Sequence, residues 1–510
     1  MRKCFALTRM CSLQLHPTIS NSRILNQLPR FCSEDSAVHK YRKSNAEYLY
    51  PLMKELLPTC ASYDELKTKV IEKSEHVNNH NFDALVLRYC NAELNFELGC
   101  KFMEYLYTNR PNGPNTASLS KFLQLAHKAP EKIPLQLIEK SCEMLSAKAE
   151  LLDQNTAQVL VTGLSHTDRW KEGLKHLKMI YELGIPTAAV LDAIALAALK
   201  HNKMDIALKM MNNVAELEKQ VSEPVFESWM SRSQTFSDIE TLLQFLSTSE
   251  MIPTLETIKQ LQSWLEKHNY TWHYSTSTRK GTCSNCGHAF QRAELTTEEY
   301  KLLQKGILEK VLTGEDIFRR STPAEVKSFR EFVAKTAPYD VILDALNVLY
   351  CKGKPTGKTN ALTIVVKDLM KKGKKVLVLG RNHIRRNTKF LPPGCNVFTI
   401  NDLSFDDAFV LYAALSSGPN AFVVSRDLMR NHAFRLRELG LHTLFKRWQR
   451  SHQFLVANIQ GEKVIYTEPE THVTAAQFDL PSRTWHVPYD DGQERLNLEV
   501  PKTWLCIPLK

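Results

Sequence analysis

Apolar residues recur at spacings of three and four from about Lys40 to Tyr270, and turn-forming residues interrupt the pattern at intervals. This periodicity predicts a series of amphipathic helices. Two stretches resemble each other, and Leu174 and Leu208 occupy matching positions that lie 34 residues apart. A period of this length built from helix pairs predicts an α-solenoid, in which each pair stacks on its neighbours to bury its apolar face.

The pattern changes between residues 338 and 457, where short apolar runs alternate with helical periodicity. Alternating strands and helices predict a parallel sheet flanked by helices. Ligands of such sheets bind at the carboxyl ends of the strands. Four runs have the character of strands, namely residues 341–343, 375–380, 395–400 and 421–425.

Aspartates follow three of these predicted strands. Asp344 follows the first, Asp406 and Asp407 come after the third, and Asp427 comes after the fourth. Each of them alone could be an ordinary partner of a helix dipole. Four carboxylates at one edge of a sheet repel one another unless a cation neutralises them. Hard oxygen ligands suit Mg²⁺ or Mn²⁺, and two such ions can hydrolyse a phosphodiester.

A basic stretch lies between these acids. Nine lysines and arginines accompany a single acid, Asp368, between Ile364 and Phe390. The stretch could be a solvated helix end, but its place inside the carboxylate domain favours contacts with phosphates. Phe390 and Trp448 are aromatic residues that could stack on bases.

The cysteines point to a second metal site. Cys283 and Cys286 have the spacing of two thiolates that bind one tetrahedral ion. His486 and Cys506 lie in two similar short segments far along the chain, and they would complete a Cys₃His set. We expect one structural Zn²⁺, because four protein ligands leave no open position. The alternative is a set of buried thiols beside a core histidine.

Composition changes this picture mainly at the N-terminus. The net charge of +11 is weak evidence for a polyanionic partner. Residues 1–33 contain five basic and no acidic residues, which is typical of a mitochondrial transit peptide, with a disordered basic tail as the alternative. No apolar run is long enough for a transmembrane helix, so we expect no membrane insertion.

The helical repeats resemble pentatricopeptide repeats, which bind single-stranded RNA, although tetratricopeptide-like packing against proteins is an alternative. The order of basic presequence, degenerate repeats, Cys-x-x-Cys, carboxylate domain and returning His and Cys resembles the protein-only ribonuclease P family, and is most similar to its animal mitochondrial branch. Three strings carry the resemblance, at residues 344–347, 405–413 and 425–432.

The resemblance implies a multidomain fold with four parts. These are a transit peptide or disordered segment over residues 1–38, an α-solenoid of pentatricopeptide-like repeats that binds RNA over 39–270, a β-rich central zinc module over 271–335 plus 478–510, and an α/β NYN/PIN-like metallonuclease domain with a parallel sheet over 336–477.

The resemblance also implies roles for individual residues. The catalytic residues would be Asp344, Asp406, Asp407 and Asp427, and the resemblance implies that they hold two Mg²⁺ ions. The ligands of the structural Zn²⁺ would be Cys283, Cys286, His486 and Cys506. Residues that position the substrate would be His432, Arg426 and Arg430. Ala345 stands where the family commonly has a glycine, and it would be strained if that position needs a positive φ.

The activity implied is that of an endoribonuclease in the mitochondrial matrix. It would remove the 5′ leader of mitochondrial precursor tRNAs and leave a 5′-phosphate on the tRNA, while the repeats bind the folded tRNA by its shape. The resemblance to the animal branch of the family implies two protein partners, a tRNA methyltransferase subunit and a short-chain dehydrogenase subunit. The alternatives are a non-catalytic organellar RNA-binding repeat protein and a metallonuclease that acts on other mitochondrial RNAs.

Overall fold

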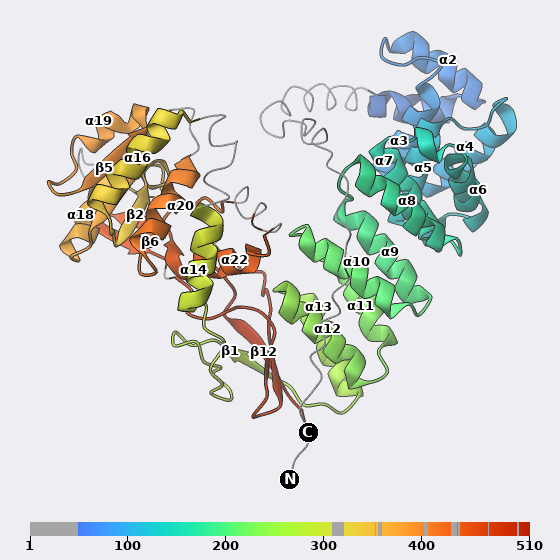
Figure 1. Ribbon diagram of the computed structural model, residues 1–510. Helices are drawn as coiled ribbons and strands as arrows, with labels where there is room; N and C mark the ends of the chain where they lie inside the picture. Colours follow the sequence, from blue (N-terminus) through green and yellow to red (C-terminus); the bar gives the residue numbers. More distant parts are fainter. Residues whose placement is uncertain are drawn as a thin grey trace, which may run out of the picture. The chain divides into compact units, whose positions relative to one another are not determined.

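A computed structural model gives the fold of the protein (Figure 1). It describes residues 49–308, 321–351, 353–354, 360–401, 406–429, 436, 439–467, 469–496 and 499–509. The chain divides into two compact units, one ending at Gly184 and the other beginning at Ile185. Among the described residues, no helix has the length and apolar character that a membrane span requires.

The first unit consists of helices. Helices two apart along the chain pack on one another, α3 on α5 and α5 on α7, as in a solenoid. Polar residues begin several of them: the side chain of Asn115 accepts a hydrogen bond from the backbone N–H of Ser118 at 2.8 Å, which caps α5. The α-helices are α2 (Tyr63–Lys73), α3 (Phe82–Glu93), α4 (Phe96–Asn109), α5 (Thr116–Lys128), α6 (Leu135–Ser146), α7 (Gln154–Leu164) and α8 (Trp170–Leu183), preceded by helical residues 49–56.

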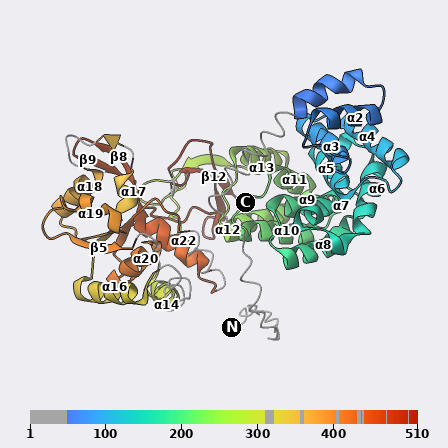
Figure 2. The ribbon, with the colours of Figure 1, turned by 90° about the horizontal axis from the view of Figure 1, so that it is seen from above.

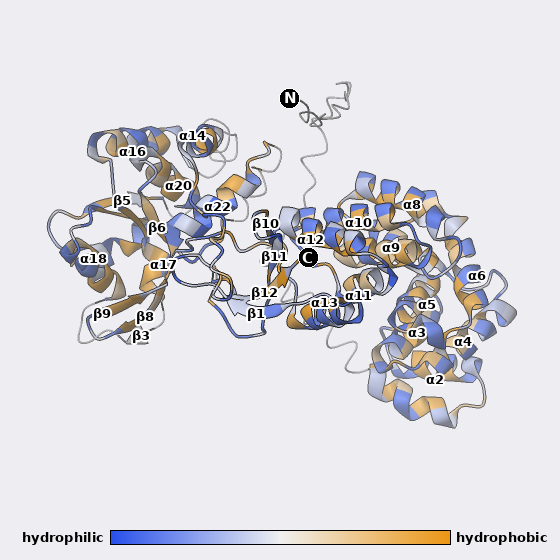
Figure 3. Ribbon diagram, turned by 90° about the horizontal axis from the view of Figure 1, so that it is seen from below, coloured by the Kyte–Doolittle hydropathy of each residue, from blue (hydrophilic) through white to orange (hydrophobic). Residues whose placement is uncertain are grey.

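The second unit begins with five more helices: α9 (Ala188–Lys200), α10 (Met204–Glu216), α11 (Glu223–Arg232), α12 (Phe236–Ser249) and α13 (Leu255–Lys267). Helices α9 and α10 pack as a pair, and α11 packs on both α9 and α13. The predicted period is confirmed, because α9 begins 34 residues after α7, at Ala188 against Gln154. The helices carry both hydrophilic and hydrophobic positions, as Figure 3 shows, so each has an apolar side to bury.

A small antiparallel sheet follows the helices. Its four strands lie in the order β1 (His273–Thr276), β12 (Thr503–Pro508), β11 (Thr484–Pro488) and β10 (Gln477–Asp479). Residues near position 275 therefore pair with residues near position 505. Two backbone hydrogen bonds join this β module to the start of α13: Leu255 donates to the Asp490 carbonyl, and Asp490 donates to the Pro253 carbonyl, each at 2.9 Å.

The α/β domain contains the predicted parallel sheet. Its five strands lie in the order β5 (Asn396–Ile400), β4 (Val376–Arg381), β2 (Val341–Asp344), β6 (Phe422–Val424) and β7 (Gln453–Phe454), and every neighbouring pair is parallel. Both faces are covered, so the strands are apolar at successive positions. Ile342 belongs to one hydrophobic core, and its neighbours Val341 and Leu343 belong to the other.

Different elements cover the two faces of this sheet, as Figure 2 shows. Four helices supply the core on one face: α14 (Thr297–Gly306), α16 (Pro323–Thr336), α20 (Asp406–Ser417) and α22 (His442–His452). The other face packs against α17 (Ala345–Leu349), α18 (Ala361–Lys371) and a three-stranded sheet of β3 (Gly353–Lys354), β8 (Val456–Gln460) and β9 (Lys463–Tyr466). Trp448 lies in the first core with 1% of its surface exposed, so it is not available to stack on bases.

Candidate active site and metal centre

Asp344 is the last residue of β2, at the carboxyl edge of the parallel sheet. Only 3% of its surface is exposed. Its carboxylate caps α17, because Oδ1 accepts a hydrogen bond from the backbone N–H of Asn347 at 3.2 Å. The other oxygen, Oδ2, accepts from the Asn347 side-chain amide and from the hydroxyl of Ser425, the latter at 3.0 Å. The carboxylate is thus held in one orientation by donors from two strand ends.

Asp427 follows β6, the strand beside β2, and its side chain is exposed. Ser425 joins the two strand ends, because its oxygen accepts from the backbone N–H of Asp427 at 3.1 Å while its hydroxyl donates to Asp344. The Asp427 carboxylate in turn accepts from the backbone N–H of Met429 at 2.7 Å. Met429 is buried and has a φ of 49°, so the chain turns sharply just after the aspartate.

Asp406 and Asp407 begin helix α20, which connects β5 to β6 and packs against β2, β4 and β6. A crossover helix of a parallel sheet starts at the edge where the preceding strand ends, so these residues also belong to the carboxyl edge. The Asp407 side chain is half-buried, and Asp406 is described by its backbone alone. All four predicted aspartates therefore come from the same edge of the sheet, where they offer hard oxygen donors.

The predicted Cys₃His set meets in the β module. The ligand atoms of Cys283, Cys286, His486 and Cys506 all lie within 4.8 Å of one another. Pairing of β11 with β12 sets His486 directly opposite Cys506. Zn–S and Zn–N bonds of about 2.3 and 2.0 Å in a tetrahedron separate sulfur and nitrogen by about 3.5 Å, and the Cys286 Sγ to His486 Nε2 distance is 3.8 Å. In the described part of the chain this is the one group of three or more His, Cys, Asp or Glu side chains that converges in this way.

Electrostatics at this group also fit a soft cation. Burial lowers the pKa of His486 to about 4, so its imidazole is neutral at physiological pH and has a lone pair to donate. Burial raises the pKa of the Cys506 thiol to about 12. A thiolate at that position is therefore costly without a bound cation. The His288 ring stacks on the His486 ring at 4.8 Å and fixes its plane.

Comparisons with known proteins place these two sites in one family. Residues 277–506 match the sequence model of protein-only RNase P, a range that contains the Cys₃His group and all four aspartates. Residues 277–506 belong to the protein-only RNase P family.

Individual members of the protein-only RNase P family show how far the similarity extends. The mitochondrial ribonuclease P catalytic subunit of Rattus norvegicus is 29% identical over 392 residues, which are 72% of this chain and 65% of the rat protein. The Mus musculus protein of the same name is 28% identical over 389 residues, 72% of this chain and 66% of its own length. The chain thus spans just under two thirds of the length of these relatives.

A solved structure shares the fold. Nuclear proteinaceous RNase P 2 from Arabidopsis thaliana superposes with a TM-score of 0.54 at 15% identity, over 85% of this chain and all of that chain. The expected fold is confirmed: stacked helices, a β module with a zinc-type ligand set, and a parallel α/β domain.

Ala345, which departs from the pattern expected of the protein-only RNase P family, is not strained. It is buried and begins helix α17, and it is absent from the non-glycine residues with positive φ among those described. A methyl group is therefore compatible with the backbone after Asp344.

Of the three residues expected to position substrate, the structure describes only Arg426. Arg430 and His432 lie outside the described residues. Arg426 is half-buried, and its guanidinium donates to the Val456 carbonyl at 3.2 Å. Its backbone N–H donates to the Asn347 side chain at 3.3 Å. Asn347 and Ser425 lie within the segments that carry the family resemblance, 344–347 and 425–432. Their role in orienting the Asp344 carboxylate becomes visible only in the hydrogen bonds of the structure.

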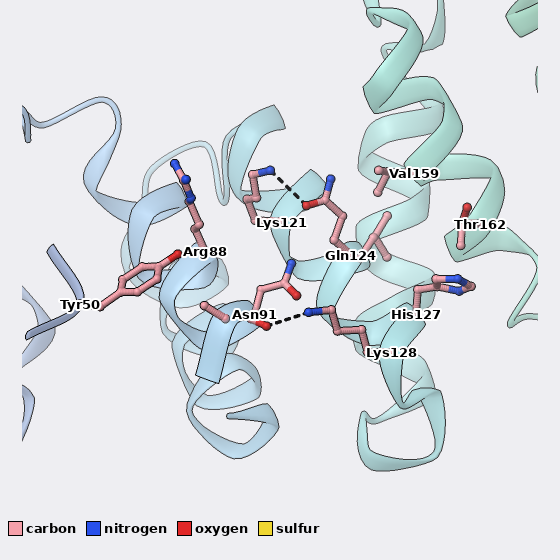
Figure 4. Close-up of a pocket in the computed structure, with 11 residues that line it drawn as sticks. Tyr50, Arg88, Asn91, Lys121, Gln124, His127, Lys128, Val159 and Thr162 are labelled. Carbon is pink, nitrogen blue, oxygen red and sulfur yellow. Dashed lines mark hydrogen bonds between the residues drawn. The ribbon is translucent and has the colours of Figure 1, made fainter. Parts of the chain in front are cut away.

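The first unit contains a groove of about 470 Å³ that is lined by both polar and apolar residues (Figure 4). It crosses α3, α5 and α7, the helices that stack next to one another. The Lys121 ammonium donates to the Gln124 side chain at 3.0 Å, and the Lys128 ammonium donates to the Asn91 carbonyl at 2.9 Å. Cations held beside amides in a groove of this size suit a nucleotide. The polar and aromatic lining residues are Tyr50, Arg88, Asn91, Lys121, Gln124, His127, Lys128 and Thr162.

Glu470 makes the β-module region sensitive to pH. Burial raises the pKa of this carboxyl to about 7, although Lys502 and Arg450 act in the opposite direction. The folded protein therefore holds this proton more tightly than the unfolded chain, so the carboxyl's contribution to stability is lost as pH rises from about 4.5 through about 7. We expect Glu470→Gln to melt at nearly the wild-type temperature at pH 5 and above it at pH 8, by scanning calorimetry. An equal difference at both pH values would contradict this cause.

Proposed function

We propose that the chain is an endoribonuclease that removes the 5′ leader of mitochondrial precursor tRNAs by metal-dependent phosphodiester hydrolysis and leaves a 5′-phosphate on the tRNA. The observation that carries the proposal is the match of residues 277–506 to protein-only RNase P, because this range holds the aspartates at the strand ends. Two relatives named as mitochondrial ribonuclease P catalytic subunits support the mitochondrial setting.

The aspartates fit divalent cations by the chemistry of their donors. Asp344, Asp406, Asp407 and Asp427 would hold one or two Mg²⁺ or Mn²⁺ ions, which supply a nucleophile from water and charge for the leaving oxygen. Asp344 is buried, and Asn347 and Ser425 orient it through hydrogen bonds. These donors compensate the buried charge and fix the direction of the carboxylate, which is the supporting shell that a metal ligand requires.

The helical unit supports the RNA-binding part of the proposal. Arg88, Lys121 and Lys128 line a groove across stacked helices, and Tyr50 adds an aromatic ring. A tRNA is largely double-stranded, so its recognition by such a surface relies on shape and phosphates. We also propose that the chain is located in the mitochondrial matrix. Because the relatives are named as subunits of a ribonuclease P, we propose that it acts with a tRNA methyltransferase subunit and a short-chain dehydrogenase subunit.

A cleavage assay tests the function. A mitochondrial precursor tRNA is incubated with Mg²⁺ and the chain, alone and with the two expected partners. We expect a single cut at the mature 5′ end, with a 5′-phosphate on the tRNA detected by its susceptibility to a phosphate-dependent exonuclease. RNA binding without cleavage in either condition would favour a non-catalytic RNA-binding protein. Cuts in messenger or ribosomal RNA, but not at the tRNA 5′ end, would indicate a nuclease of other RNAs.

A further inference from the structure

The basic stretch of the α/β domain is divided by strand β4 into two groups at opposite edges of the sheet. Lys367 and Lys371 lie in the last turns of α18, and Lys374 lies two residues before β4 begins, so these lysines belong to the amino edge. Arg381 ends β4, and Arg385, Arg386 and Lys389 follow it at the carboxyl edge. Only the second group shares its edge with the aspartates.

Segment 381–390 is anchored beside Asp344. Leu379 pairs with Asp344 across neighbouring strands, and Arg381 lies two residues further along β4, about 7 Å beyond that level. The buried side chain of Ile384 packs into the space above Gly380, where a Cβ atom would lie 2.3 Å from Ile384 Cδ1 and 3.0 Å from Ala345 Cβ. Ala345 follows Asp344 in the chain and lies in the same hydrophobic core as Ile384, so this core holds the segment close to the aspartate.

Two hydrogen bonds hold the turn that comes next, α19 (Arg385–Thr388). The Asn360 side chain donates to the Asn387 carbonyl at 3.2 Å. The Arg385 Nε donates to the Thr399 hydroxyl at 3.3 Å, which ties the segment to β5. The segment is thus tied to the start of α18 through its backbone and to β5 through the Arg385 side chain, while Arg385, Arg386 and Lys389 remain exposed.

The exposed groups of this segment are of the kinds that bind single-stranded RNA in other proteins. Arg385, Arg386 and Lys389 are exposed, and in the described part of the chain neither Arg386 nor Lys389 has an ion-pair partner. Phe390 follows directly with 71% of its surface exposed. Cations that contact phosphates beside an aromatic ring that stacks on a base form the usual platform for unpaired nucleotides. The bases of a duplex are stacked on one another and cannot use such a ring.

We infer that segment 385–390 binds the unpaired 5′ leader of the precursor RNA, with Arg385, Arg386 and Lys389 on its phosphates and Phe390 on a base. The inference rests on the proposed function, since it assigns a place to the leader of the proposed substrate. The leader is unpaired and continues from the bond to be cut, and the segment lies at the edge of the sheet that carries the aspartates. The amino-edge lysines serve as an internal control of equal charge.

The test measures binding with two matched RNAs, a precursor tRNA with an unpaired leader of about ten nucleotides and the same tRNA ending at its mature 5′ end. Binding is measured in Ca²⁺ by fluorescence anisotropy, and a gel verifies that the RNA stays intact. The variants are Arg385→Gln/Arg386→Gln/Lys389→Gln and the control Lys367→Gln/Lys371→Gln/Lys374→Gln. Each removes three positive charges from exposed positions.

We expect the wild-type chain to bind the precursor more tightly than the mature tRNA, and the arginine variant to lose that difference. The slope of log affinity against log salt for the precursor should fall by about two, at about 0.7 for each phosphate contact to a single strand. The lysine variant should keep the difference. If both variants lower the affinity for both RNAs equally, the overall positive electrostatic potential of the domain explains the effect, and the inference is wrong.

Phe390 provides a second, independent readout. Phe390→Leu retains an apolar side chain without a ring, so we expect about a tenfold loss of affinity for the precursor. Phe390→Tyr should restore it, and the mature tRNA should bind both variants as it binds the wild type. Because the side chain is exposed, thermal unfolding should be unchanged in both variants. Equal binding of the precursor by the leucine and tyrosine variants would overturn the stacking role.

Failure of this inference is distinguishable from failure of the proposed function. Precise cleavage at the mature 5′ end without any leader-dependent binding would keep the function and remove the leader platform. Leader-dependent binding lost in the arginine variant, without cleavage by the wild type, would keep the platform and remove the nuclease. A third RNA with a 3′ extension and no leader completes the set, since tighter binding of that RNA, lost in the arginine variant, would assign the segment to the other end of the tRNA.

Discussion

Replacing Asp344 with asparagine is expected to abolish cleavage of precursor tRNA while RNA binding persists. The change removes one negative charge and one metal-binding oxygen from the strand end, and charge stabilisation by a bound metal amounts to several kcal/mol, so the rate should fall about a thousandfold or more. Single-turnover cleavage measures the chemical step, and anisotropy with the mature tRNA measures binding. The side chains that orient Asp344 can also bond to an amide, so the fold should survive.

Asp340 provides a matched control on the same strand. It directly precedes β2 at the amino edge, where its carboxylate accepts a hydrogen bond from the backbone N–H of Lys375 at 2.8 Å. Asp340→Asn changes the charge by the same amount and should cleave at nearly the wild-type rate. Cleavage by Asp344→Asn at a rate similar to Asp340→Asn would remove Asp344 from the active site.

Replacing Cys506 with serine is expected to release the bound metal and to destabilise the β module. Cys506 is buried on β12 and pairs with His486 on β11 and His273 on β1, so it lies at the centre of the sheet. A structural zinc site contributes several kcal/mol of folding free energy. Each kcal/mol shifts the melting temperature by about 2–4 °C in a folding unit of about 150–250 residues. We expect a fall of about 10 °C in calorimetry and zinc below one equivalent by elemental analysis.

Cys395 is a suitable control for this change. It is half-buried, lies in the α/β domain just before β5, and is outside the converging group. Cys395→Ser should retain zinc and melt close to the wild type. Full zinc content in Cys506→Ser would show that the Cys₃His group is not a metal site, and a chelator should lower the melting temperature of the wild type but not that of Cys506→Ser.

The sequence pattern was sufficient for the order of helices and strands because both depend on local periodicity. The 34-residue spacing survives in the structure, since α8 and α10 begin at Trp170 and Met204. The strands of the parallel sheet are apolar on both faces, which made them visible as short apolar runs. The zinc-type ligands could be named because a Cys-x-x-Cys pair needs two further soft ligands, and two similar short segments around His486 and Cys506 each offer one. The bounds expected for the four parts of the chain remain a prediction.

Other features depend on contacts that no local pattern contains. The hydrogen bonds of Asn347 and Ser425 to Asp344 join residues up to 81 positions apart. The basic stretch is continuous in sequence, yet the six residues of β4 carry its two halves to opposite edges. Trp448 could not be assigned to the core by its type alone, because tryptophan serves both in cores and on binding surfaces.

The Cys₃His group closes a long loop of chain. Cys286 and His486 are 200 residues apart, and the α/β sheet lies in the loop between them. Bringing the ends of a flexible loop of that length together costs about 5 kcal/mol in chain entropy, but a folded α/β domain already holds the two ends of its own chain in place. We therefore expect the domain to fold first and the metal to bind last. Zinc uptake during refolding should then follow the folding of the domain that carries the aspartates.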